Sequence, residues 1–237
     1  MRKGMEMKIN EVDKVGGFLN KGDYIYNKPP MASYNNHATF KFNKRSLWLE
    51  FTSKIYIKKD ELTDISFDNI RYYTEELAKK KGIITTADAL LNMRVCWIDC
   101  KKDVQVVNPQ EMLSYLRELA YQSTLKNEII TFIKDLGFEQ SLVIKSSCKT
   151  VKDSLSIYTK VDEMYAHRAD DWEYYNNFSQ VFFENNKNLL RFERRLQDAK
   201  AIKKAMHWDK KEPVRLIDVL EHPHNIVGEK VKQVFKV

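Results

Sequence analysis

The sequence predicts an α+β domain in which a largely antiparallel sheet is covered by helices. Two observations favour this class: strand-like segments come in adjacent pairs, and helical segments are gathered between those pairs. In addition, the sequence contains neither a glycine-rich phosphate loop nor a regular strand–helix–strand alternation. A doubly wound parallel sheet is therefore the less favoured class.

The composition is that of one soluble, folded unit. Hydrophobic residues make up 43% of the chain and charged residues 31%, with only 7 glycines and 5 prolines, so we expect a single domain over 1–237. No apolar run approaches the roughly 18 residues that a membrane span needs. The amino terminus lacks the apolar core of a secretory signal. We therefore expect a cytoplasmic protein with no membrane partner.

The first elements are predicted from turn and capping residues. Two strands around a turn at 43–46 are expected in 37–57. A helix follows over 66–82, with Ser66 as its N-cap and Gly82 as its C-terminal stop. A shorter helix and a single strand come next, over 85–92 and 93–106.

The middle of the chain is predicted to hold two helices. In 108–120, Asn108 can cap the helix and Pro109 fits its first position. Apolar side chains recur there at helical spacing, at Met112, Leu113, Leu116 and Leu119. A second helix is expected over 124–137, ending at Gly137.

Strands dominate the prediction for the next part. Two strands are expected at 140–147 and 153–160, then a long charged and aromatic helix over 162–186. The segment 188–196 is either a strand or a strand-to-helix turn. The remainder is basic and helical, with a loop at 221–228.

Polar side chains on the predicted strands are the candidates for a site. Because strand side chains alternate between faces, Tyr158 and Lys160 share a face opposite the apolar one. Two acids, Glu50 and Asp99, also lie on predicted strands. One face of a further strand carries Arg191, Glu193 and Arg195. Each has a structural explanation as well: a solvated residue for Glu50, a buried acid paired with Arg94 or Lys101 for Asp99, and a cross-strand charge ladder for Arg191 and Glu193.

Together these residues have the chemistry of a phosphoryl-transfer site. Two or three carboxylates on one sheet face would bind Mg²⁺ or Mn²⁺, which prefer hard oxygen ligands. A nearby tyrosine could attack a phosphorus atom that the metal polarises. Lys160 would favour the ionised form of the phenol. These are the parts of a tyrosine transesterase that nicks DNA.

Four stretches in order, "WLEF", "RVCWIDC", "SLSIYTKVDEM" and "LLRFERRL", resemble the replication initiators of filamentous phages, the gene II protein family, and related phage and plasmid rolling-circle Rep proteins. The resemblance runs from residue 47 to 205, about two thirds of the chain. It implies an HUH-endonuclease-like sheet and an enzyme that nicks origin DNA, forms a 5′-phosphotyrosyl adduct and rejoins the strand.

The resemblance also implies a role for each matching position. Tyr158 matches the DNA-cleaving nucleophile, and Lys160 matches a phosphate or phenolate partner. Arg191 would contact the scissile phosphate or hold Glu193. The implied metal ligands are Glu50 and Asp99, with the coordination completed, or a ligand oriented, by Glu163 and Glu193.

The histidines depart from the family pattern. Many rolling-circle initiators bind their metal with a histidine–hydrophobic–histidine strand, and none stands at the expected place here. The pair His222 and His224 flanks a proline, which argues for a loop. His37 precedes the first expected strand and is a further candidate ligand.

Charge points to a polyanionic partner. Lys and Arg number 40 against 33 Asp and Glu, a net charge of +7. Lys126, Lys203 and Lys204 are candidates for contacts with a nucleic-acid backbone, or are solvated helix faces. The implied partners are origin DNA, as a hairpin or a single-stranded nick site, with a host helicase and polymerase; a homodimer is compatible with this.

Three alternatives remain open at the level of sequence. The chain could be a non-catalytic single-stranded nucleic-acid-binding protein of the same ancestry. It could be an unrelated RNA-binding domain in which Tyr158 is a stacking platform. It could also be a scaffold for protein contacts, with its charge serving solubility.

Overall fold

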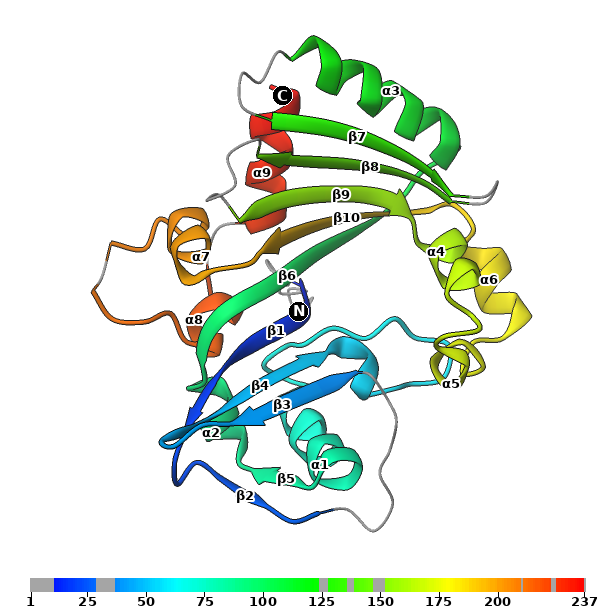
Figure 1. Ribbon diagram of the computed structural model, residues 1–237. Coiled ribbons are helices and arrows are strands. Elements are labelled where there is room, and N and C mark those ends of the chain that lie inside the picture. Colours follow the sequence, from blue (N-terminus) through cyan, green and yellow to red (C-terminus); the bar gives the residue numbers. More distant parts are fainter. Residues whose placement is uncertain are drawn as a thin grey trace, which may run out of the picture.

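The computed structural model describes residues 11–28, 37–123, 128–135, 139–146, 152–209, 211–222 and 225–236. Its centre is an eight-stranded sheet in which every neighbouring pair of strands is antiparallel (Figure 1). The predicted fold class is therefore confirmed. In spatial order the strands are β3 (Ala38–Phe42), β4 (Ser46–Thr52), β1 (Glu11–Asn20), β6 (Arg94–Gln105), β10 (Leu189–Leu196), β9 (Asp153–Thr159), β8 (Glu139–Ser146) and β7 (Glu128–Asp135).

A second, two-stranded sheet pairs β2 with β5 near the β3 end of the molecule (Figure 1). Its strands are β2 (Tyr24–Tyr26) and β5 (Ile83–Thr85). The helices of the described residues are α1 (Ile70–Lys81), α2 (Ala87–Leu91), α3 (Pro109–Gln122), α4 (Lys160–Ala166), α5 (Trp172–Tyr175), α6 (Gln180–Asn186), α7 (Ala199–Ala205), α8 (Leu216–Leu220) and α9 (Ile226–Phe235). None of them is long and apolar enough to cross a membrane.

One face of the large sheet carries the main hydrophobic core. Alternate residues of β4 and β9 are buried in it, as the alternation of strand side chains requires, including Leu47, Leu49, Leu155 and Ile157. Side chains from α1, α3 and α9 pack against them. A separate aromatic cluster joins α4, α5 and α6, formed by Val161, Met164, Tyr174, Phe178, Phe182 and Phe183. The other sheet face carries polar side chains of β9 and β10, together with Trp48 and Trp97 on β4 and β6.

Two of the predicted capping residues mark helix ends in the structure. Asn108 caps α3, accepting hydrogen bonds from the backbone N–H groups of Gln110 and Glu111 at 3.1 and 3.3 Å. Gly82 ends α1 in the left-handed conformation, with φ 69°. The start of α1 differs from the prediction, because Asn69 rather than Ser66 is the N-cap.

Two helix predictions are wrong. The segment 124–137 contains β7, not a helix, because β7 pairs along its whole length with β8 and its "IITFI" run is rich in residues that favour strands. The long helix over 162–186 is three short ones. Its last part begins at a separate cap, where Ser179 Oγ accepts a hydrogen bond from Phe182 N at 3.2 Å.

Strand β1 was not anticipated from the sequence, although it lies between β4 and β6. A β-bulge at Gly16 and Gly17 lets it fit there. A Cβ atom on Gly17 would lie 2.3 Å from the carbonyl oxygen of Arg94. The close approach of the two backbones therefore requires glycine, and β1 carries Asp13 and Lys14 to the polar face.

Candidate active site

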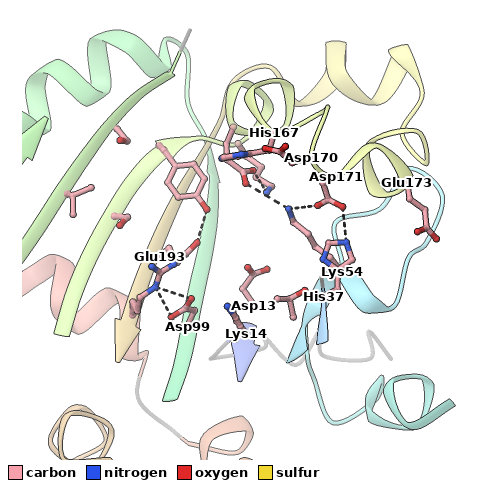
Figure 2. Close-up of a pocket in the computed structure, with 18 of the residues that line it drawn as sticks. Asp13, Lys14, His37, Lys54, Asp99, His167, Asp170, Asp171, Glu173 and Glu193 are labelled. Carbon is pink, nitrogen blue, oxygen red and sulfur yellow. Dashed lines mark hydrogen bonds and ion pairs between the residues drawn. The ribbon is translucent and has the colours of Figure 1, made fainter. Parts of the chain in front are cut away.

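A polar cavity of 790 Å³ lies on this face, walled on one side by the sheet and on the other by α4, α5 and the loop between them (Figure 2). It contains both the predicted nucleophile and most of the predicted acids. Its lining residues are Asp13, Lys14, His37, Thr52, Lys54, Asp99, Ser141, Val143, Ser156, Tyr158, Lys160, Glu163, His167, Asp170, Asp171, Trp172, Glu173, Glu193 and Arg195.

Tyr158 is coupled directly to a carboxylate. Its hydroxyl donates a hydrogen bond of 2.7 Å to Oε2 of Glu193 on the neighbouring strand β10. Burial raises the pKa of the Tyr158 phenol well above its ordinary value, the charge of Glu193 raises it further, and the charge of Arg191 opposes them. The phenol is therefore neutral at rest, with an acceptor already in place for its proton.

Arg195 bridges two of the predicted acids. Its Nε lies 3.2 and 3.1 Å from the two carboxylate oxygens of Asp99, and its Nη2 lies 3.1 Å from Oε1 of Glu193. Burial, together with the charge of Glu193, raises the pKa of Asp99 to about 8, although Arg195 lowers it. The structural explanation for Asp99 was a pair with Arg94 or Lys101; its partner is instead Arg195, the residue opposite it on β10.

Lys160 does not share the strand face of Tyr158. Strand β9 ends at Thr159, and Lys160 is the first residue of α4, buried and paired with Glu163. Burial and the charges of Arg191 and Lys54 lower the pKa of Lys160 to about 8, against the opposing effect of Glu163. Lys160 thus lines the cavity as one half of an ion pair.

Arg191 is buried and does not line the cavity, which argues against the predicted contact with a DNA phosphate. It is 2% exposed, and its Nε and Nη2 donate to the two oxygens of Asp103 at 2.7 and 2.6 Å. Its Nη1 lies 3.7 Å from Asp13. Arg191 is directly opposite Tyr158 in the β9–β10 register. Arg191 therefore contributes a fixed, buried positive charge on the strand next to Tyr158.

Asp13, which the sequence did not single out, is held within the same network. Its Oδ1 accepts hydrogen bonds from Ser53 Oγ at 2.7 Å and from Lys101 Nζ at 3.3 Å. The charges of Lys101 and Arg191 outweigh its desolvation and lower the pKa of Asp13 well below its ordinary value. Asp13 is therefore an ionised and already compensated acid.

The four predicted metal ligands are not gathered into one cluster. Glu50 lies outside the cavity, 3.0 Å from Lys14, beside a smaller hollow lined by Trp48 and Trp97. Glu163 is paired with Lys160. Across the described ranges, no three Asp, Glu, His or Cys side chains form a group that could hold a metal ion. Asp99 and Glu193 are the two predicted ligands that the structure brings together.

The other predicted residues fall in different places. His37 lines the cavity, but its Nε2 is 2.8 Å from Asp171, which Lys54 also contacts at 2.9 Å. Lys203 and Lys204 lie on α7, away from the cavity lining, and Lys203 Nζ donates to the carbonyl of Lys211. Lys126 and His224 lie outside the described residues, and His222 is buried.

Acidic side chains outnumber basic ones in the lining. Seven carboxylates stand against four lysine and arginine side chains, the acids being Asp13, Asp99, Glu163, Asp170, Asp171, Glu173 and Glu193. A substrate phosphate would add more negative charge. Several of these acids are already compensated, however: Asp13 by Lys101 and Arg191, Glu163 by Lys160, and Asp171 by Lys54.

Sequence reasoning missed several lining residues, above all Asp13, Lys54 and Trp172. The buried valines of "EVDKV", Val12 and Val15, were only a weak signal for β1, because a register irregularity between Val12 and Lys14 breaks the strict alternation of a strand. No comparable signal marked Lys54 or Trp172, which reach the cavity from a 3₁₀ turn and a four-residue helix.

Comparison with known proteins gives one structural likeness. No family model matches the chain, and no curated protein does. The structure of a rolling circle replication initiator protein from Geobacillus stearothermophilus superposes with a TM-score of 0.41 at 10% sequence identity, covering 84% of this chain and 78% of that one.

Proposed function

We propose that the protein nicks and rejoins single-stranded DNA by transesterification through Tyr158, as a rolling-circle replication initiator does. The observation that carries this proposal is the hydrogen bond from the Tyr158 hydroxyl to Glu193 inside a polar cavity. A nucleophile within hydrogen-bond reach of a base, with the base held by a third group, is the arrangement that activates hydroxyl nucleophiles. Arg195 is that third group here.

Cleavage would transfer the scissile phosphate from its 3′ oxygen to Tyr158. The Tyr158 oxygen bonds to the scissile phosphorus while its proton passes to Glu193 Oε2. The bond between phosphorus and the 3′ oxygen breaks, and that oxygen leaves as a hydroxyl after taking a proton from solvent. The 5′ phosphate stays on Tyr158. Attack by a 3′ hydroxyl, which loses its proton to solvent, breaks the bond between phosphorus and Tyr158 and rejoins the strand, and Glu193 returns its proton to the Tyr158 oxygen.

Arg191 is the cation that favours the phenolate. Its charge opposes the effects of burial and of Glu193 on the pKa of Tyr158, and two hydrogen bonds to Asp103 prevent it from turning away. Lys160 is a weaker candidate for this role than the sequence indicated, because its ammonium group is engaged by Glu163.

The residues present fit a Mg²⁺ or Mn²⁺ ion held by two carboxylates. Mg²⁺ is commonly bound by one or two carboxylates together with substrate phosphates, so a full protein cage is not needed. Asp99 and the Oε1 side of Glu193 would hold it, since both now contact the half-exposed Arg195. When bound, the ion would offset the acidic lining and the charge on the phosphoryl oxygens.

The experiment is a cleavage assay on single-stranded and supercoiled origin DNA with Mn²⁺ or EDTA, resolved on a denaturing gel. We expect metal-dependent nicking and a covalent protein–DNA band that is lost in Tyr158→Phe. Tyr115→Phe is the matched control, because Tyr115 is 59% exposed on α3 and lies outside the cavity. An adduct retained in Tyr158→Phe would move the nucleophile to another residue.

One observation favours a second candidate, a non-catalytic protein that binds single-stranded nucleic acid. Two of the expected ligands, Glu50 and Glu163, are already paired with lysines. This candidate predicts tight DNA binding by the wild type with no nicking under any metal condition. The expected partners, which are origin DNA and a host helicase and polymerase, are part of the nicking proposal alone. A homodimer is compatible with it.

A further inference from the structure

We propose that Trp172 forms a stacking site for one unpaired base of the DNA strand, in the cavity wall that faces Glu193. The inference rests on the proposed function and deepens it. Trp172 lines the cavity with Tyr158, yet its side chain is 64% exposed. An exposed ring inside a polar cavity is the typical platform for an unpaired base, because every base has a flat face that can stack.

The backbone that carries Trp172 is fixed, although the ring is uncovered. Asp171 contacts both His37 and Lys54, at 2.8 and 2.9 Å. Tyr174 is buried, and its ring packs against Phe178 with centroids 5.0 Å apart. Trp172 lies between these two anchored residues. Its backbone is therefore held in place before any ligand binds, which lowers the entropic cost of binding.

The stacking site at Trp172 lies across the cavity from Glu193, the proposed proton acceptor of Tyr158. Figure 2 shows Asp171 and Glu173, the neighbours of Trp172, on the side of the cavity opposite Glu193 and Asp99. A strand that crosses the cavity can therefore place a phosphate at Tyr158 and a nearby base on Trp172. Stacking would then fix the register of the strand at the reacting bond.

The charges around Trp172 favour a base over a phosphate. Asp170 and Glu173 are exposed and line the cavity, and neither side chain has a hydrogen bond or ion pair within the described part of the chain. Their charge would repel a phosphate. A carboxylate only accepts hydrogen bonds, so it suits the exposed amino groups of adenine, cytosine or guanine, whereas the one donor of thymine, N3–H, lies between two carbonyl oxygens that a carboxylate repels. We therefore expect thymine to be the least favoured base at this position.

Binding can be measured without cleavage in a Tyr158→Phe background of the full chain. The probes are short labelled single-stranded oligonucleotides of adenine or of thymine, and fluorescence anisotropy is the readout. We expect Trp172→Ala to weaken adenine-strand binding about tenfold, as loss of one base–aromatic stack does. Trp172→Phe should retain most of the affinity. Adenine strands should bind more tightly than thymine strands, and Asp170→Asn with Glu173→Gln should reduce that preference.

The matched control is Phe67→Ala, since Phe67 is 52% exposed but does not line the cavity. It should leave binding unchanged. A second test uses oligonucleotides with a single abasic position that is moved along the strand. At one position the abasic strand should bind the Tyr158→Phe parent as weakly as the intact strand binds the parent with Trp172→Ala added. Thermal melting checks that the variants are folded.

Equal binding by folded Trp172→Ala and its parent would overturn the stacking site, while nicking through Tyr158 could still hold. The stacking site would also be overturned if no abasic position weakened binding. If the Tyr158→Phe protein binds no oligonucleotide at all, the proposed function fails, and the stacking site fails with it.

Discussion

Arg195 and Asp99 lie directly opposite each other on strands β10 and β6, and the guanidinium Nε contacts both oxygens of the carboxylate. Asp99 is 2% exposed, whereas the Arg195 side chain is 44% exposed. The cation of this pair is thus the partner that has room to move. Because Arg195 also contacts Glu193, it occupies the position between the two acids that the structure brings together.

This arrangement makes Arg195 a competitor for a divalent cation. In Arg195→Gln the guanidinium charge is gone, so we expect Mn²⁺ to raise the melting temperature of the variant more than that of the wild type. Asp99→Asn in the same background should remove the effect. Thermal melting at a series of Mn²⁺ concentrations measures both, and an identical Mn²⁺ response in wild type and Arg195→Gln would contradict the expected competition.

Glu193→Gln tests the proposed proton acceptor. The amide keeps the size of the side chain and can still accept a hydrogen bond from Tyr158, but it cannot take the proton. We expect single-turnover cleavage to fall by about 10² to 10⁴, the usual contribution of a general base. DNA binding in the absence of metal serves as the control and should persist. Cleavage within about threefold of wild type would exclude Glu193 as the base.

Asp99 should make stability depend on pH. Its pKa is raised from 3.8 to about 8 in the folded protein. Between these values the folded state holds a proton that the unfolded chain has lost, so this stabilisation is complete below about pH 4 and is lost as pH rises through about 8. The free energy of unfolding should fall by up to about 1.4 kcal/mol per pH unit in that window.

The comparison with Asp99→Asn isolates this effect, because asparagine does not titrate. Urea unfolding of both proteins at several pH values below 8 should show the wild type losing stability relative to the variant as pH rises. Above this pH the lowered pKa of Lys160 makes stability change with the opposite sign. Parallel pH profiles for the two proteins would show that Asp99 is ionised throughout.

The buried pair Arg191 and Asp103 should be a major contributor to stability. Asp103→Asn leaves the buried guanidinium without its carboxylate, and breaking one side of such a pair typically costs about 3–5 kcal/mol. Urea unfolding measures this. Glu61→Gln is a suitable control, because Glu61 forms an exposed ion pair with Lys58 and should change stability by under about 1 kcal/mol. A loss that small for Asp103→Asn would mean that Arg191 finds another partner.

The sequence by itself determined which side chains share a strand face. Alternation along β4, β9 and β10 placed Leu47, Leu155 and Leu190 in the core, and it set Tyr158 and Glu193 on the polar side. Such faces follow from local backbone geometry, since successive strand residues point in opposite directions. The α+β class followed in the same way from the order of the elements.

Only the tertiary structure decided which polar residues meet. Tyr158 contacts Glu193 because β9 pairs with β10, and Arg195 contacts Asp99 because β10 pairs with β6. It also decided that 128–135 is a strand, that Lys160 begins a helix and that Arg191 is buried. Pairing depends on contacts between residues far apart in the chain, and burial depends on what covers them. Neither is encoded in the periodicity of a single segment.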